Sequence, residues 1–89
     1  MNSKKLALKI RQHSVKMANR GGGSHIGSAL SIADILAVLY SNTLMIKPEL
    51  PDWELRDRFI LSKGHAGAAV YATLAEKGFF PYASLNESF

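Results

Sequence analysis

Two short glycine-rich segments, each containing a histidine, are the residues of this chain best suited to chemistry. The first, Gly21–Ser28, has three consecutive glycines, then His25 and a fourth glycine. The second, Gly64–Gly67, places His65 between two glycines. Ordering a run of glycine is entropically expensive, so such a run is expected where the backbone approaches another molecule closely. A histidine there can donate to a phosphate or hydroxyl oxygen, and its pKa near neutrality lets it exchange protons.

Neither segment is a complete nucleotide-binding motif. Gly64–Gly67 lacks the lysine and hydroxyl that close a P-loop, and its glycine spacing differs from that of a dinucleotide fingerprint. No carboxylate or third imidazole stands beside either histidine in the sequence, so the pair alone does not predict a metal site. A single histidine flanked by glycine is more often an ordinary loop residue, and the functional prediction therefore depends on the two segments together.

A helix is predicted before the first glycine segment, over Ser3–Asn19. Leu6, Ile10 and Met17 lie on one face of it at helical spacing. The glycine run that follows is a natural stop for a helix. His13 is predicted to be a boundary residue of the apolar face and not a ligand.

A second helix is predicted after the first glycine segment. Ser31 and Asp34 have the spacing of a capping box, with Asp in place of the usual Glu or Gln. The residues that follow, up to Tyr40, are apolar on nearly every side. Because a helix that is apolar on most sides is buried on most sides, part of this burial is expected to come from polypeptide outside the chain.

The second histidine segment is predicted to follow a strand. Lys47–Asp57 contains two prolines and is predicted to be a connector that Trp53 anchors against the core. Phe59–Ser62 is a short apolar run, consistent with a fully buried strand of a parallel sheet, although four residues do not exclude a helix.

The last predicted helix, Ala68–Lys77, follows the second histidine segment and ends before Gly78. No closing element is recognised from residue 82 to residue 89. This order of helices, glycine loops and one strand describes the start of an α/β unit. Because one strand makes no sheet, residues 1–89 are predicted to form part of an α/β domain that other polypeptide completes.

The composition places the chain with ordinary globular proteins. Of its 89 residues 47% are hydrophobic and 20% are charged, and the absence of cysteine excludes disulfides and thiolate metal sites. The net charge of +4 is concentrated before Asp34, but no interleaved aromatic residues or recognition motif support nucleic-acid binding. No run approaches the roughly 20 apolar residues of a membrane span, and no signal peptide is recognised. A cytoplasmic protein without nucleic-acid or membrane partners is predicted.

The two histidine motifs, in this order and at this separation, resemble the N-terminal region of the transketolase family. The resemblance covers about residues 6 to 82 and rests on Gly22–Leu36, Asp57–Gly67 and the helix that ends at Lys77–Pro81. It is greatest to the amino-terminal subunit of split, two-chain transketolases. It implies the N-terminal portion of a thiamine-diphosphate-binding domain. It also implies a transferase that moves a two-carbon ketol unit from a ketose phosphate to an aldose phosphate.

The resemblance also implies roles for three residues. It makes His25 and His65 catalytic, with His25 binding substrate hydroxyls and with His65 and Gly64 binding the cofactor diphosphate. The implied cofactors are thiamine diphosphate and a divalent metal, Mg²⁺ or Ca²⁺. The chain lacks the family's Gly-Asp-Gly segment, so no residue is assigned to the metal, and the 89-residue chain alone is expected to be inactive. Ile26 stands where many one-chain transketolases have proline.

The implied partners are the remaining transketolase polypeptide or a second subunit, in a dimer or heterotetramer. Two alternatives share the same fold. One is a truncated, non-catalytic interaction module, and the other is an enzyme similar to deoxyxylulose-phosphate synthase, which the residue after His25 also resembles.

Overall fold

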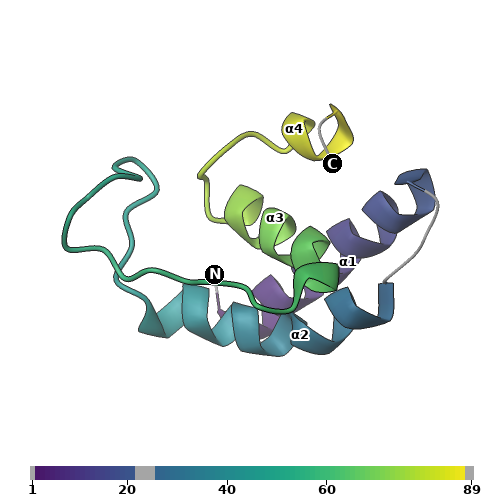
Figure 1. Cartoon of the computed structure of the whole chain (residues 1–89), viewed down its shortest axis with the longest axis horizontal. Coiled ribbons are helices and arrows are strands. Elements are labelled where there is room, and N and C mark those ends of the chain that lie inside the picture. The colour runs from purple at the N-terminus through teal and green to yellow at the C-terminus, as the bar shows by residue number, and fades with distance from the viewer. Residues whose placement is uncertain (1, 22–25, 88–89) are drawn as a thin grey trace.

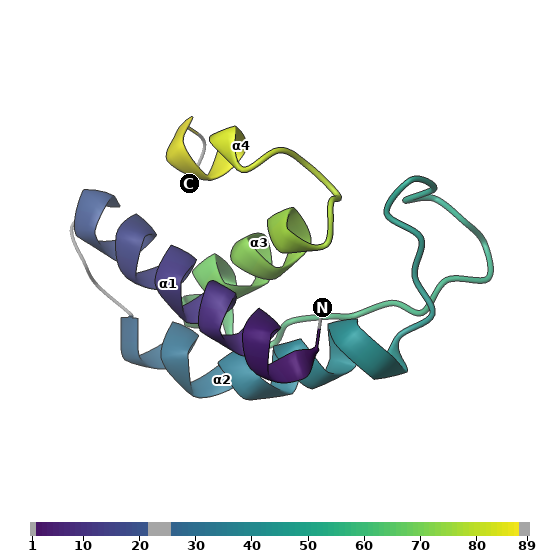
Figure 2. The same ribbon diagram turned by 180° about the vertical axis from the view of Figure 1, so that it is seen from behind.

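The computed structural model consists of helices joined by one long connector (Figure 1). It describes residues 2–21 and 26–87, and the side chains of residues 2–19 and 26–85. In chain order the elements are α1 (Ser3–Gly21), α2 (Ile26–Val38), the π-helical turn η1 (Leu39–Thr43), the 3-10 turn η2 (Gly64–Ala66), α3 (Gly67–Glu76) and α4 (Ala83–Glu87). Both views show α1, α2 and α3 packed together, with α4 beyond α3 (Figures 1 and 2).

The first helix forms as its apolar spacing predicts. Leu6, Ile10 and Met17 are all buried along one face of α1. Asn2 caps the helix, because its Oδ1 accepts a hydrogen bond of 2.8 Å from the backbone N–H of Lys5. The cap satisfies one of the N–H groups that a helix start otherwise leaves unpaired.

The second helix begins at Ile26, before the predicted capping box, so that prediction is wrong. Ser31 lies inside α2, and its Oγ donates to Ser28 O at 3.0 Å. Asp34 accepts two hydrogen bonds from the Arg11 guanidinium of α1, at 3.2 and 2.9 Å. Because the backbone is already helical before Ser31, no helix end remains there for a cap to satisfy.

Alanine makes much of the core between the helices. α2 buries Ala29, Ala33 and Ala37 at a spacing of four residues, and α3 buries Ala69 and Ala72. Small side chains at these contacts let helix axes approach one another closely. The largest fully buried side chains, which fill the remaining space, are Leu6, Ile10, Leu36, Thr73 and Ser14.

The opposite side of α2 is apolar but exposed. Ile35 is 59% exposed and Val38 is 48% exposed, and Met45 just beyond η1 is similarly open. The predicted helix is therefore buried on one side only within this chain. The exposure of apolar residues on the other side agrees with the expectation that other polypeptide buries this side.

The segment Ile26–Thr43 is also long and apolar enough to cross a membrane, as judged by length and composition alone. Its mean hydropathy over 18 residues is 1.3. One such helix is weak evidence, because core helices of globular proteins have the same length and composition. The expectation of no membrane partner stays a prediction.

No strand forms among residues 2–21 and 26–87, so the predicted strand at Phe59–Ser62 is not confirmed. The segment is extended and runs over α2 toward η2 (Figure 1). Phe59 contacts Tyr40 edge-on, with 6.1 Å between ring centroids, whereas Ile60 is 85% exposed. Ladder hydrogen bonds need a second strand, and the described residues supply none. Of the predicted α/β unit, the described chain forms the helical part.

The connector between η1 and η2 is closed at its base. Met45 N donates to Asp57 Oδ2 and Asp57 N donates to Met45 O, both at 2.7 Å. Trp53 packs inside the connector, with the Lys47 ammonium 4.5 Å from its ring centroid. Trp53 is half-buried, and the prediction that it anchors the connector on the core stays a prediction.

The C-terminal end of α3 is closed by Gly78, as predicted. Its φ of 90° is in the left-handed region, where a residue with a Cβ is strained. Gly78 N donates to Ala75 O at 3.1 Å and Phe79 N donates to Leu74 O at 3.0 Å. These two bonds form a Schellman motif, which satisfies the last carbonyls of the helix.

We predict that Gly78→Ala lowers the free energy of unfolding by about 1–2 kcal/mol, because alanine at this φ is strained. Gly27→Ala is the matched control, since a Cβ at Gly27 meets no atom within 4 Å and alanine favours a helix. Urea unfolding of both variants measures the difference. Equal stability of the two variants would contradict the assigned role of Gly78.

A closing element follows the turn after α3, although none was predicted. Leu85 of α4 is buried against Met17 of α1 and Ala75 of α3, which form a second small apolar cluster. A helix of five residues is too short to show a reliable period in sequence, so tertiary packing decides its structure.

Candidate functional site

The second histidine lies at the point where the extended segment turns into α3. Gly64 N donates to Ser62 O at 3.1 Å, and Lys63 between them has φ −85° and ψ 79°. These values define an inverse γ-turn centred on Lys63. The 3-10 turn η2 follows directly and carries His65. Ala66, which is fully buried, fixes the far end of the turn against the helices.

The turn is exposed on the side that carries the predicted site residues. His65 and Gly64 are both exposed, and a Cβ added at Gly64 would meet no atom within 4 Å. Among the described residues, no side chain caps the start of η2 or of α3. The start of α3 therefore presents the positive end of its helix dipole beside an exposed histidine.

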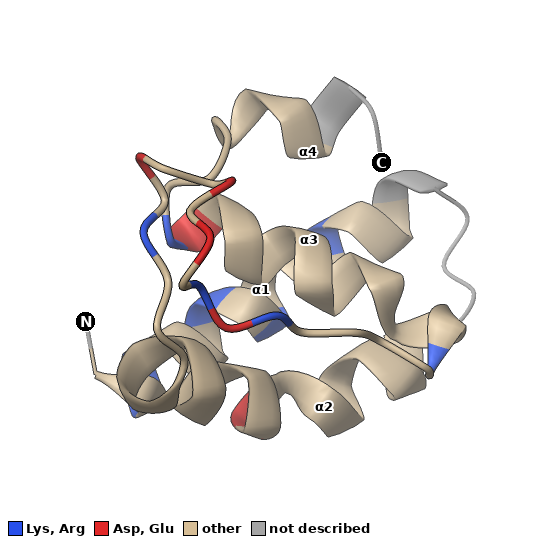
Figure 3. Ribbon diagram, turned by 60° about the vertical axis from the view of Figure 1, so that its left-hand side comes forward, with Lys and Arg blue, Asp and Glu red and all other residues tan. Residues whose placement is uncertain are grey.

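The donors at this turn suit one end of a diphosphate. The imidazole of His65 and the uncapped start of α3 both favour an anionic oxygen ligand, and Gly64 has no side chain that would keep such a ligand away. The acidic residues of the connector lie at the opposite side of the molecule from this turn (Figure 3). The residues present thus fit the diphosphate part of the implied cofactor.

The other predicted site residue, His25, lies outside the described residues. The structure does bring the neighbourhood of the two segments together, because η2 is held against the first turns of α2. Lys63 Nζ donates to Ser28 O at 3.3 Å and to Ser31 Oγ at 2.5 Å. The roles predicted for His25, His65 and Gly64 stay predictions.

A metal site does not appear in the part of the chain that the structure describes. Residues 2–21 and 26–87 contain no group of three or more histidine, cysteine or acidic side chains that could hold a metal ion. The expectation that metal ligands come from other polypeptide stays a prediction.

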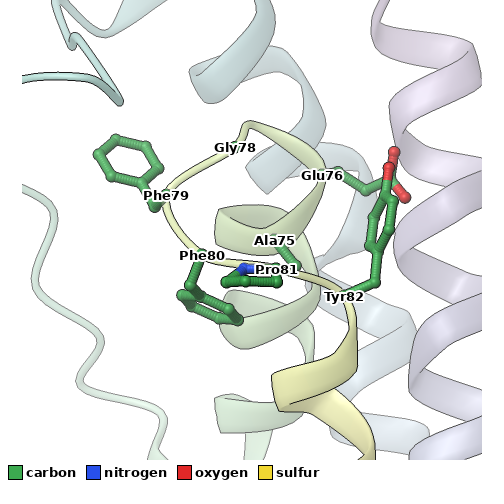
Figure 4. Close-up of a pocket in the computed structure, with 7 residues that line it drawn as sticks. All are labelled: Ala75, Glu76, Gly78, Phe79, Phe80, Pro81 and Tyr82. Atoms are coloured by element: carbon green, nitrogen blue, oxygen red, sulfur yellow. The ribbon is translucent and has the colours of Figure 1, made fainter.

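A second polar cluster, at the far end of α3, was not predicted as such. His13 Nε2 donates to Glu76 Oε2 at 2.7 Å, and the Glu76 side chain is only 3% exposed. Tyr82 stacks on His13 with 5.5 Å between ring centroids, and its hydroxyl end is directed toward Glu76 (Figure 4). His13 is partly buried, so its prediction as a boundary residue is confirmed.

This cluster borders an open pocket of about 500 Å³. The pocket is lined by Ala75, Glu76, Gly78, Phe79, Phe80, Pro81 and Tyr82 (Figure 4). His13 and Glu76 are 63 residues apart in sequence, so no local pattern could have indicated their contact. The cluster joins α1, α3 and the segment before α4.

We predict that Tyr82 titrates above its ordinary pKa of 10.0, because the nearby charge of Glu76 opposes formation of the phenolate. Burial and a hydrogen bond to Glu76 raise the pKa of Tyr82 further. The contact between Tyr82 and Glu76 stabilises the folded state fully below pH 10.0, and this stabilisation is lost as the pH rises through the raised pKa of Tyr82. Ultraviolet absorbance of the phenolate, followed against pH, measures the pKa of Tyr82.

In Glu76→Gln the ionisation of Tyr82 is expected at lower pH than in the unsubstituted protein, since the negative charge of the Glu76 carboxylate is removed. Tyr82→Phe identifies which transition belongs to this residue, because burial also raises the pKa of Tyr40. A Tyr82 transition that stays in place in Glu76→Gln would contradict the assigned cause.

Residues 2–87 match the family described as transketolase, thiamine diphosphate binding domain. The chain therefore belongs to this family of thiamine-diphosphate-binding domains. The match includes both histidine segments and all the helices described above.

Two relatives are named as subunits of transketolases. The chain is 46% identical over 77 residues to the 6-deoxy-6-sulfo-D-fructose transketolase subunit SqwG of Clostridium sp. (strain MSTE9), and the match covers 86% of this chain and 28% of that subunit. It is 39% identical over 71 residues to one subunit of the apulose-4-phosphate transketolase of Phocaeicola vulgatus, covering 80% of this chain and 25% of that protein. The chain thus resembles the amino-terminal subunit of split transketolases.

One-chain transketolases match as well. The transketolase of Homo sapiens is 40% identical over 82 residues, which cover 92% of this chain and 13% of that enzyme. The chain therefore spans less than a third of the relatives it matches.

Proposed function

We propose that this chain is the first part of a thiamine-diphosphate-dependent transferase that moves a two-carbon ketol unit from a ketose phosphate to an aldose phosphate. The observation that carries the proposal is the placement of His65 on an exposed turn at the start of α3, tied to the first turns of α2. That placement occurs in a chain matching the cofactor-binding domain over residues 2–87.

In this proposal each site residue has a separate task. Gly64 and His65 hold the diphosphate: the imidazole of His65 can donate to its oxygens, and Gly64, which has no side chain and whose N–H is bonded to Ser62 O, lets the diphosphate approach the backbone closely. His65 also holds or moves a proton beside the reacting centre, and His25 donates to substrate hydroxyls. When bound, thiamine diphosphate supplies the electron sink for breaking and making the carbon–carbon bonds.

The remainder of the site is proposed to come from other polypeptide. That polypeptide would provide ligands for Mg²⁺ or Ca²⁺, the strands that pair with residues 59–62, and a cover for the exposed side of α2. Support comes from the exposed Ile35, Val38 and Ile60, which would be buried in a complete α/β domain. We further propose a dimer or heterotetramer located in the cytoplasm.

A chimera tests the proposal. This chain replaces the matched 77-residue segment of the Clostridium subunit SqwG, and the product is assembled with the subunit that completes that transketolase. Calorimetric titration with thiamine diphosphate and Mg²⁺ is expected to show binding by the assembly and little or none by the 89-residue chain. The unmodified SqwG, assembled in the same way, serves as the positive control.

Absence of binding by a folded chimera would contradict the proposal. Binding without ketol transfer, in an assembly whose unmodified form is active, would favour the non-catalytic interaction module instead. A product that forms only with a decarboxylating keto acid as donor would favour an enzyme similar to deoxyxylulose-phosphate synthase.

A further inference from the structure

The connector between η1 and η2 is held in one conformation by its own hydrogen bonds. Besides the paired bonds at its base, Leu50 N donates to Lys47 O at 2.9 Å and Trp53 N donates to Leu50 O at 3.0 Å. Arg56 donates to Trp53 O twice, from its backbone N–H at 3.2 Å and from Nη1 at 2.8 Å. A loop that is already ordered loses little conformational entropy when it binds a partner.

The outer surface of the connector is acidic and partly apolar (Figure 3). Leu50 is 52% exposed and Leu55 is 74% exposed. Around them lie three exposed carboxylates, and within the part of the chain that the structure describes none of the three forms an ion pair: Glu49, Asp52 and Glu54. We call these five residues the connector surface.

The outer face of α1 has the opposite charge. Leu8 is 54% exposed and Val15 is 51% exposed, and their spacing of seven residues places them on one side of the helix. The sequence of α1 contains no acidic residue. Beside the two apolar residues lie exposed lysines, none of which forms an ion pair with another described residue: Lys4, Lys5, Lys9 and Lys16. These six residues are the α1 surface.

The two surfaces complement each other but do not meet within one molecule. Among residues 2–21 and 26–87, no ion pair or side-chain hydrogen bond joins α1 to the connector. Figures 2 and 3 both show α1 beginning on the side of the molecule from which the connector projects. A two-fold axis on that side brings the connector of each copy to α1 of the other, so that both contacts form together and the pair is closed.

We propose that two copies of this chain pair through these surfaces, with the connector surface of each copy on the α1 surface of the other. Opposite charge favours this arrangement over contacts between two like surfaces, which repel. The inference goes beyond the proposed function, because it uses no residue of the turn that carries His65. That turn lies at the opposite side of the molecule from the acidic connector and stays open to other polypeptide (Figure 3).

Sedimentation equilibrium of the 89-residue chain tests the pairing. A reversible dimer is expected, with a Kd on the order of 10–100 μM, because two small and charged contacts bury less than a standard interface. Raising the ionic strength from about 50 mM to about 500 mM is expected to weaken the dimer about tenfold, since exposed charges are screened.

A charge exchange between the surfaces is the sharper test. Lys5→Glu with Lys9→Glu lowers the net charge of +4 by four, to zero, yet it is expected to raise the Kd at least about tenfold, because like charges then face each other. Glu49→Lys with Glu54→Lys is expected to raise the Kd similarly. An equimolar mixture of the two variants is expected to pair within about threefold of the unsubstituted Kd, because both contacts again join opposite charges.

The apolar part of the contact is tested by Leu55→Gln, which is expected to raise the Kd about tenfold. Ile60→Gln is the matched control, because Ile60 is 85% exposed and lies outside both surfaces. It is expected to leave the Kd unchanged. Circular dichroism of each variant shows whether the helices still form.

Four results would overturn the inference. The first is a chain that stays monomeric at about 1 mM, and the second is a dimer that salt does not weaken. The third is a mixture of the charge variants that pairs no more tightly than either variant alone. The fourth is a dimer that Ile60→Gln weakens and Leu55→Gln does not, which would place the contact on the extended segment. None of these results bears on cofactor binding by the SqwG chimera, so the proposed function is judged separately.

Discussion

Replacing His65 by alanine in the chimera is expected to lower kcat/KM for ketol transfer by about 10²–10⁴-fold, the range seen when an acid–base group is lost. His65 is exposed at the start of α3, so its removal leaves no cavity in the core. The assembly is therefore expected to form and to unfold as the unsubstituted protein does. Steady-state kinetics, together with calorimetric binding of thiamine diphosphate, measures the effect.

His13→Gln is the matched control for this substitution. His13 contacts Glu76 at the far end of α3, roughly 15 Å along the helix from His65 at 1.5 Å per residue. Glutamine can still donate to Glu76, so activity is expected to stay within about twofold of the unsubstituted chimera. Unchanged activity in His65→Ala would remove His65 from the mechanism, and equal losses in both variants would indicate a general structural effect.

Leu36→Ala is expected to lower the free energy of unfolding by about 2–5 kcal/mol, because it opens a cavity in the core. Leu36 is fully buried, whereas its neighbour Ile35 is 59% exposed on the other side of α2. Ile35→Ala is therefore expected to cost at most about 0.5 kcal/mol in the 89-residue chain. Urea unfolding followed by circular dichroism measures both.

In the completed assembly the same pair tests the proposed cover on α2. There Ile35→Ala is expected to cost about 1–3 kcal/mol, since the side chain would become buried against the added polypeptide. A cost that stays near zero in the assembly would show that nothing covers Ile35. A large cost already in the isolated chain would contradict its exposure in the structure.

The helices were predictable because their signals are local. The spacing of Leu6, Ile10 and Met17 identified the buried face of α1, and Gly78 marked the end of α3 from its residue type alone. The exposed side of α2 was also expected, because α2 has more apolar surface than one small chain can cover.

The predictions that failed depend on contacts that sequence patterns do not contain. Ser31 and Asp34 had the spacing of a capping box, yet their partners are Lys63 and Arg11 on other elements. The strand predicted at residues 59–62 is not confirmed, because a strand needs a neighbouring strand, which the described residues do not supply. Leu85 was not predicted to be a core residue, because the short helix α4 has no recognisable hydrophobic period and forms through packing against α1 and α3.

The candidate site was predicted only in part for the same reason. Glycine spacing and residue type identified Gly64 and His65, and the structure places both on an exposed turn before a helix. The contact between Lys63 and Ser31 joins residues 32 positions apart, and that between His13 and Glu76 joins residues 63 positions apart. Only the folded chain brings these partners together.

The paired hydrogen bonds between Met45 and Asp57 make the intervening segment an insertion point. Because the two ends of residues 46–56 are already joined, lengthening this segment changes the entropy of loop closure only slowly. A reporter peptide inserted beside Leu50, which is exposed, would leave the path of the chain into η2 in place. The assembly of this chain with other polypeptide could then be followed without a label near His65.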